Sequence, residues 1–156
     1  MPFRYRLQKV LDFRIRKKEE QQQAVQRAKD EVARRQALVD KNQEEIQGVI
    51  HTMRTTTDFR MMDVYDQYLK HLYQKEVQLI EDKKEAEQIV RQEEEKLIEC
   101  EKGVKVLEKH KEMSREAWIE EEKAIENKQM SEIAVQKYFE RQRKEREEKE
   151  LNNEED

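Results

Sequence analysis

Histidine and clustered carboxylates are the side chains in this sequence that could bind a metal ion or transfer protons. The histidines His51, His71 and His110 have no cysteine or second histidine at the spacing that a zinc site requires. The carboxylate runs Glu93-Glu94-Glu95 and Glu120-Glu121-Glu122 are expected to be solvated on exposed helix, where they are unsuited to acid–base catalysis. Two isolated glycines cannot form a phosphate-binding loop. We therefore expect no metal, no cofactor and no catalytic residue.

The single cysteine, Cys100, cannot form an internal disulfide. It falls on an apolar helical register, which favours a small buried hydrophobe, and the alternative is a reactive thiol. Its neighbours Glu99 and Glu101 are acidic and no histidine is near in sequence, so the first interpretation is preferred. Nothing in the cysteine usage indicates an oxidising compartment.

The composition is typical of long helices rather than of a layered globular enzyme. Of the 156 residues, 45% are charged and 35% hydrophobic, and the sequence contains two glycines and one proline. Apolar runs never exceed three residues, as in Ala117-Trp118-Ile119, whereas a bilayer-spanning helix needs roughly 20. We expect a cytoplasmic protein with neither a membrane span nor a signal peptide.

One coiled-coil seam is predicted in the first third of the chain, where steps of three and four residues alternate. Its members are Val25, Ala28, Val32, Arg35, Val39, Asn42, Ile46, Val49 and Met53. The polar members Arg35 and Asn42 either fix the register of the coiled coil or, in the case of the long arginine, extend into solvent.

A second seam follows, with polar interruptions at Glu76, Lys83, Glu93 and Lys111. Its regular part comprises Met62, Tyr65, Leu69, Leu72, Leu79, Ala86, Val90, Leu97, Cys100, Val104 and Leu107, and a less regular part continues to Trp118, Ile125, Val135 and Phe139. The two seams predict two helices that pack against each other.

The chain is predicted to reverse at residues 54–58, where three threonines precede Asp58, a suitable N-cap. We expect an all-α protein whose two long helices form an antiparallel coiled-coil hairpin. The helices are predicted at about residues 3–53 and 59–148 of a single domain, 1–148, followed by a frayed acidic tail, 149–156. Pairing outward from the turn places Val39 near Leu72. About 40 residues of the second helix then form a C-terminal overhang.

Residues 59–80 contain more apolar side chains than the seam uses. The surplus residues are Phe59, Met61, Val64, Tyr68, Tyr73, Val77 and Ile80. They indicate either an exposed docking face or a broader apolar face that closes the hairpin. The glycines Gly48 and Gly103 lie within continuing periodicity and are expected to remain helical.

The first residues carry a recognisable motif and an unusual charge. Residues 1–18 contain seven Lys or Arg and one Asp, although the net charge of the chain is −4. Phe3-x-Tyr5-x-Leu7-x-x-Val10-Leu11-x-x-Arg14 resembles the start of the FliJ family, small coiled-coil proteins of the flagellar type III export apparatus. The resemblance continues in Leu107-Glu108-Lys109-His110-Lys111 and in Glu132-Ile133-Ala134.

The resemblance implies a non-enzymatic stalk for flagellar protein export and biogenesis. Its terminal helices would insert into the hexameric export ATPase, and its turn end would approach the membrane-embedded export gate. The implied ATPase-binding residues are Phe3, Tyr5, Leu7, Leu11, Arg14, Arg16, Lys17, Tyr138 and Phe139. The implied gate-binding residues are Tyr68, Leu72, Lys75 and Leu79. The basic side chains would steer the insertion, and the family also suggests escort of export chaperones. We expect a monomer, peripherally associated with the inner face of the membrane at the flagellar base.

Two other classes of function compete with the stalk. A generic structural coiled coil could bury its overhang in a homodimer, and the basic N-terminal helix could bind anionic membrane or nucleic acid. Nucleic acid is disfavoured because the positive charge stops at Lys18, and residues 19–35 are neutral by count. The membrane is disfavoured because Arg14, Arg16, Lys17 and Lys18 leave no clean apolar face.

Overall fold

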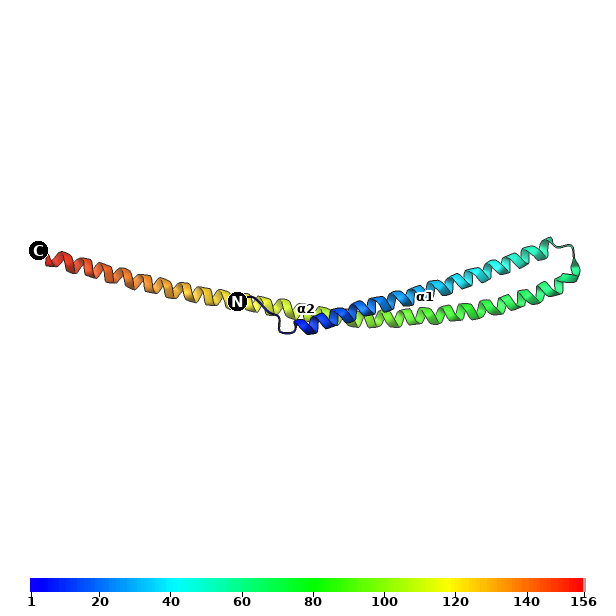
Figure 1. Cartoon of the computed structure of the whole chain (residues 1–156), viewed down its shortest axis with the longest axis horizontal. Helices are drawn as coiled ribbons and strands as arrows, with labels where there is room; N and C mark the ends of the chain where they lie inside the picture. Colours follow the sequence, from blue (N-terminus) through cyan, green and yellow to red (C-terminus); the bar gives the residue numbers. More distant parts are fainter. Residues whose placement is uncertain (156) are drawn as a thin grey trace. The chain divides into compact units, whose positions relative to one another are not determined.

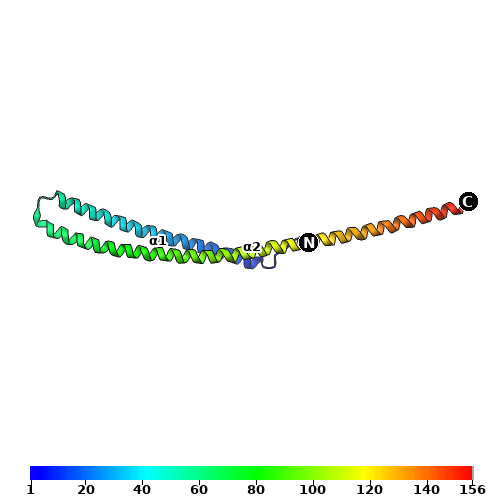
Figure 2. The same ribbon diagram turned by 180° about the vertical axis from the view of Figure 1, so that it is seen from behind.

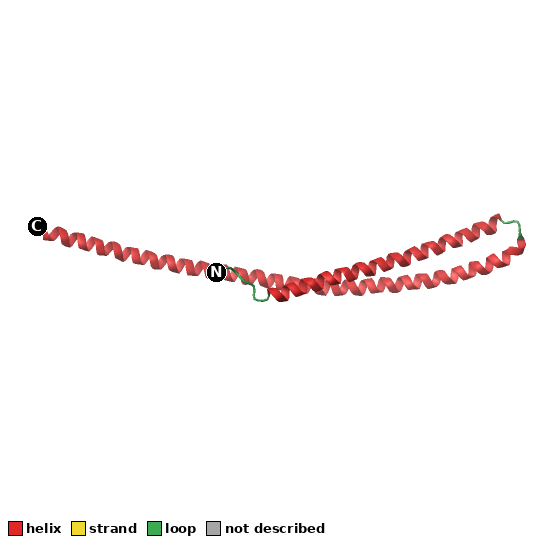
Figure 3. Cartoon of the chain, viewed as in Figure 1, coloured by secondary structure: helices red, strands yellow, loops and turns green. Residues whose placement is uncertain are grey.

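The computed structural model describes residues 1–155 as two α-helices joined by a short reversal. Helix α1 spans Gln8–Thr55, the 3-10 helix η1 spans Phe59–Met61, and helix α2 spans Met62–Glu154. The non-helical residues lie in the first residues, in the reversal and, after α2, at Glu155 (Figure 3). The predicted all-α helical hairpin is confirmed.

The reversal lies where the sequence places it. Thr56 and Thr57 are non-helical, and the Asp58 side chain caps η1 by accepting a hydrogen bond from the Arg60 backbone N–H at 3.0 Å. Helix α1 nevertheless continues to Thr55, two residues beyond the predicted end. The hydroxyl of Thr55 donates to the His51 carbonyl oxygen at 3.0 Å, which is a bond compatible with helical backbone.

The hairpin formed by Lys9–Val106 is one compact unit. Within it α1 and α2 run side by side in both views (Figures 1 and 2). The buried residues of its core are Leu11, Val25, Val39, Asn42, Ile46, Leu72, Ala86 and Val104. Every predicted seam residue within this unit is buried or half-buried, and so are the polar interruptions Glu76, Lys83 and Glu93. The hydrophobic periodicity therefore identified the packed face correctly.

The seam also extends further toward the N-terminus than predicted. Leu11 is buried, and Ile15, Lys18 and Gln21 are half-buried. These positions continue the steps of three and four residues back from Val25. The sequence pattern is hard to see there because a lysine and a glutamine occupy two of the positions. The Gln21 amide is satisfied across the hairpin, where it donates to the Glu93 carbonyl oxygen at 2.9 Å.

The register between the helices differs from the prediction by one seam step. The Asn42 amide donates to the Leu72 carbonyl oxygen at 3.0 Å, so Leu72 lies opposite Asn42 rather than Val39. Arg35 pairs with Asp82 at 3.5 Å, in agreement with that register. The pairing was wrong because α1 extends beyond its predicted end, to Thr55, before the chain turns into η1.

A second compact unit comprises Met1–Gln8 and the part of α2 from Leu107 onward. Residues 1–7 are not helical, whereas the first helix was expected from about residue 3. Helix α2 continues to Glu154, through most of the segment expected to be frayed. The contacts thus cluster in two units, where the sequence predicted a single domain over 1–148.

No helix among the described residues is long and apolar enough to cross a membrane. No group of three or more His, Cys, Asp or Glu side chains within residues 1–155 is arranged to hold a metal ion.

Candidate partner-binding surfaces

The first surface is built on the non-helical residues Met1–Leu7, which we call the N-terminal strap. The strap ends in a turn. In this turn the Gln8 backbone N–H donates to the Tyr5 carbonyl oxygen at 3.2 Å, and α1 begins at Gln8. Tyr5 is buried, while Phe3 and Leu7 are half-buried. Arg4 and Arg6, which alternate with them, are exposed.

The strap is fastened to α2 by hydrogen bonds and an aromatic contact. The Tyr5 hydroxyl donates to the Leu107 carbonyl oxygen at 3.3 Å and lies 2.7 Å from His110 Nδ1. Lys111 Nζ donates to the Gln8 side-chain oxygen at 2.7 Å. The ring centroids of Phe3 and Trp118 are 6.0 Å apart with an interplanar angle of 46°. Such a contact between tilted rings is favourable.

Two of the residues that the family resemblance implies in ATPase binding are buried within the chain. Tyr5 is only 9% exposed and Leu11 only 3%. A side chain buried to this extent cannot also present its surface to a partner. We therefore leave both residues out of the ATPase contacts proposed below: Tyr5 anchors the strap, and Leu11 belongs to the hairpin core.

Arg14 has a structural contact that the sequence analysis missed. Its guanidinium donates to the Gly103 carbonyl oxygen at 3.0 Å. A β-carbon at Gly103 would lie 3.7 Å from the Arg14 side chain, which is ordinary contact distance. In the sequence, the signals for this contact were Arg14 itself and Gly103 in the facing helix. Neither residue alone indicates that the two are in contact. Arg14 links α1 to α2 as well as contributing charge.

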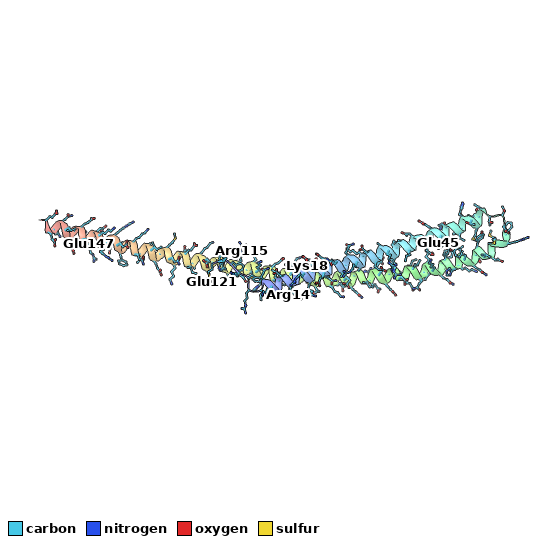
Figure 4. All side chains as sticks on the ribbon, viewed as in Figure 1. Arg14, Lys18, Glu45, Arg115, Glu121 and Glu147 are labelled. Atoms are coloured by element: carbon cyan, nitrogen blue, oxygen red, sulfur yellow. The ribbon has the colours of Figure 1, made fainter. Side chains whose placement is uncertain are left out.

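Arg16 and Lys17 are exposed, as expected of charges that a partner could meet. Lys17 forms an ion pair with Glu20 at 3.4 Å and lies 5.5 Å from the centroid of the Phe13 ring. Figure 4 labels Arg14 and Lys18 on the first turns of α1, the basic part of the hairpin. Cys100 is half-buried and lines a groove with Arg14, Lys17 and Gly103.

The last predicted ATPase-binding residues, Tyr138 and Phe139, are exposed neighbours on α2. Their ring centroids are 6.0 Å apart in an edge-to-face arrangement, and the Gln142 amide donates to the Tyr138 hydroxyl at 2.8 Å. From Lys123 to Glu154 every residue is exposed apart from half-buried Gln142. Figure 4 shows this stretch, which includes Glu147, as a helix with no second segment beside it. The seam members Ile125, Val135 and Phe139 therefore have no packing partner within the described chain.

The exposed apolar side chains of this stretch are not confined to one face of α2. They are Ile125, Met130, Ile133, Val135, Tyr138, Phe139 and Leu151. At about 100° per residue, Ile133 and Val135 point about 160° apart around the helix axis. A stripe for a single partner helix would be narrower. This distribution suits a partner that surrounds the helix.

The second surface lies beyond the reversal, on the first turns of α2. Tyr68 is 45% exposed, Lys75 is exposed and Leu79 is half-buried. Leu72 is 1% exposed and lies in the hairpin core opposite Asn42. Leu72 is therefore not counted among the side chains that this surface exposes, because it is buried within the hairpin.

The surplus apolar residues form two flanks rather than one face. Met61, Val64, Tyr68 and Lys75 follow spacings of three, four and seven and share one flank of the seam. Tyr73 and Val77 lie five and nine residues after Tyr68, which places them on the other flank. All six side chains are exposed, in contrast to half-buried Ile80.

Two carboxylates in the hairpin have altered proton affinity. A hydrogen bond from Arg34, with a second from Arg35, lowers the pKa of Glu31 to about 2. A hydrogen bond from the Gln21 amide, supported by Lys96, lowers the pKa of Glu93. Glu93 is thus half-buried and paired, not simply solvated as expected. The direction of both shifts keeps the carboxylates ionised, which is opposite to what a general acid needs.

Comparison with known proteins gave one match. A family model described as "Flagellar FliJ protein" matches residues 3–154, which cover most of the strap and all of α1, η1 and α2. No curated protein and no solved structure matches the chain.

Proposed function

The chain belongs to the family of flagellar FliJ proteins and is thus a component of the flagellar export apparatus, and we propose that within it the chain is a stalk that links the hexameric export ATPase to the membrane export gate. The second compact unit inserts into the ATPase, and the turn end of the hairpin binds the cytoplasmic domain of the gate. The protein acts as a monomer, peripherally associated with the membrane at the flagellar base.

The observation that carries the ATPase half of the proposal is the exposed end of α2. A lone helix with large apolar side chains on several sides exposes surface that monomeric proteins usually cover. A ring of subunits can contact all sides of a helix at once, whereas a second copy of the chain in a coiled coil would cover one stripe. The surrounding partner is therefore favoured over a homodimer.

The proposed ATPase contacts comprise apolar and basic side chains that the chain leaves accessible. They are Phe3, Leu7, Arg16, Lys17, Tyr138 and Phe139. The surplus of positive charge at the start of the chain would steer this end toward an acidic rim of the ring. Export chaperones are a third proposed partner class, on the family's precedent.

The gate half of the proposal rests on the flank that contains Tyr68. Met61 at the end of η1 and Val64 and Tyr68 on α2 are exposed aromatic or apolar side chains on this flank, with Lys75 at its edge. Tyrosine and methionine are enriched in interface cores. Leu79 would contribute its accessible part, and Leu72 would support the flank from beneath.

Co-purification with the export ATPase from the same organism tests the first half, with ATP turnover measured with and without the chain. The proposal predicts a complex of one chain per hexamer and a change in turnover. Absence of a complex, together with a light-scattering mass of two chains, would instead support a structural homodimer.

Tyr68→Ala tests the second half. Because Tyr68 is half exposed, the change should shift the free energy of unfolding by less than that of a core aromatic, under about 3 kcal/mol. A central interface aromatic can contribute about 2 kcal/mol or more to binding, so affinity for the gate domain should fall strongly. Tyr73→Ala on the opposite flank is the matched control and should retain gate affinity. Equal affinity of wild type and Tyr68→Ala would remove this docking site.

A further inference from the structure

We propose that Tyr5 is a positioning residue whose hydroxyl latches the N-terminal strap to α2 and so completes a composite partner-binding surface from two distant parts of the sequence. The surface consists of Phe3 against Trp118, with Arg4 and Arg6 around them. The role in partner binding rests on the proposed function, whereas the latch itself does not.

The strap has the alternation of an extended segment that lies on a surface. Phe3, Tyr5 and Leu7 are buried or half-buried, and Arg4 and Arg6 are exposed. Successive side chains of an extended chain point to opposite sides, so one set faces α2 and the basic set faces outward. Within the described residues, neither Arg4 nor Arg6 has an ion pair or hydrogen bond, which leaves both charges free for a partner.

An extended strap is required by the spacing of its contacts. Tyr5 meets His110 and Phe3 meets Trp118, eight residues further along α2, or about 12 Å at the helical rise. A helix would advance only about 3 Å over the two residues from Tyr5 to Phe3. An extended chain advances about 7 Å, and the two aromatic side chains can bridge the remainder. If the first helix began at residue 3, the Phe3–Trp118 contact could not form together with the Tyr5 bonds.

The Tyr5 hydroxyl holds the middle of the strap to α2 through hydrogen bonds. It is buried and has two partners on consecutive turns of α2, the Leu107 carbonyl oxygen and His110 Nδ1. A phenol hydroxyl has one proton, so when it donates to Leu107 it accepts from His110. A phenylalanine at this position would retain the ring and lose both bonds. Lys111 fastens Gln8 at the end of the strap but does not reach Phe3.

The latch predicts a partner surface that is apolar at its centre and basic at its edge. The Phe3–Trp118 pair supplies the aromatic centre. Aromatic residues, tryptophan above all, often contribute most of the binding energy at protein interfaces. Arg4 and Arg6 supply the edge and would pair with carboxylates of the ATPase ring. Release of the strap would separate these elements, because Phe3, Arg4 and Arg6 belong to the strap and Trp118 belongs to α2.

The test uses the full chain with Tyr5→Phe, and Tyr73→Phe as a control that removes an exposed hydroxyl from the hairpin. Trp118 is the only tryptophan, so acrylamide quenching of its fluorescence reports on the strap without any partner. Loss of a hydrogen bond of ordinary strength should lower the ratio of docked to released strap about fivefold. Quenching should therefore rise toward that of Phe3→Ala, while the helical circular dichroism stays unchanged.

Affinity for the hexameric export ATPase is the second measurement. In Tyr5→Phe, affinity for the ATPase should fall by a factor similar to the fall in the ratio of docked to released strap. Tyr73→Phe should retain the wild-type affinity. Unchanged quenching in Tyr5→Phe overturns the latch, and increased quenching with unchanged affinity overturns the composite surface. If wild type itself fails to bind the ATPase, the proposed function fails, and the quenching result alone decides whether the latch exists.

Discussion

The hairpin and the end of α2 are made of similar residues but differ in what their apolar side chains contact. In Lys9–Val106 the aliphatic residues form a continuous core between two helices. From Lys123 onward side chains of the same types are exposed on all sides of one helix. Most helical stability in proteins comes from tertiary packing rather than from intrinsic propensity. The apolar side chains of the hairpin are thus packed within the chain, whereas those at the end of α2 remain accessible to the partner proposed above.

Truncation of one aliphatic side chain in each region is the strongest test of this difference. Leu72→Ala should destabilise the hairpin by about 3 kcal/mol, because Leu72 is 1% exposed and its removal leaves a cavity. Ile133→Ala, on the exposed part of α2, should change the free energy of unfolding by under about 0.5 kcal/mol. Thermal or urea unfolding followed by circular dichroism measures both. Equal losses would mean that the end of α2 has an internal partner.

Asn42 sharpens the comparison, since it is a polar residue inside the packed region. Its Nδ2 donates to Leu72, but its Oδ1 is buried without a hydrogen-bond partner among the described residues. An unsatisfied buried acceptor costs about 1–3 kcal/mol, so Asn42→Leu should stabilise the hairpin by about 1 kcal/mol or more. A buried polar residue can also specify register and oligomeric state. Light scattering should then detect additional oligomers in Asn42→Leu if Asn42 specifies the monomer, and an unchanged mass would assign it no such role.

Arg14 tests where the core of the hairpin ends. Its bond to the Gly103 carbonyl should make Arg14→Glu cost about 1 kcal/mol of stability. The exposed neighbour Arg16, changed in the same way, should cost under about 0.5 kcal/mol. Both changes reverse one charge, so the difference between their melting temperatures isolates the contact with α2. Identical melting temperatures would show that the Arg14 bond contributes nothing.

The smallest expected effect is a pH dependence located in α1. The guanidinium of Arg34 holds the pKa of Glu31 at about 2, below the ordinary 4.5. A lowered pKa in the folded state gives stability that is present above pH 4.5 and is lost as the pH falls toward 2. The ion pair is on the surface, so the effect should be slight. Glu31→Gln should reduce the change in melting temperature between about pH 6 and about pH 3, relative to the control Glu44→Gln. An identical pH dependence in the two variants would contradict the shift.

The sequence predicted the parts of the fold that follow from periodicity. The seams from Val25 to Val104 were recovered because each member repeats the steps of three and four residues, and the reversal because Asp58 follows three threonines. The pairing of Val39 with Leu72 failed because it depends on where α1 ends, and that helix continues to Thr55. The strap was missed because Phe3, Tyr5 and Leu7 resemble a helix start, and the non-helical strap follows from contacts more than 100 residues away in sequence, between Tyr5 and His110 and between Phe3 and Trp118. Long-range contacts of this kind leave no local pattern.

Hydrogen exchange of the full chain, with and without the hexameric export ATPase, tests the proposed stalk most directly. Exchange rates report local opening, which is fast where backbone hydrogen bonds are exposed and few apolar contacts protect them. We expect rapid exchange for residues 123–154 of the free chain and strong protection of the same residues in the complex. The core of the hairpin, around Val39 and Leu72, should be protected in both states and change little. Exchange of residues 123–154 that stays rapid when the ATPase is bound would contradict the insertion of α2 into the ring.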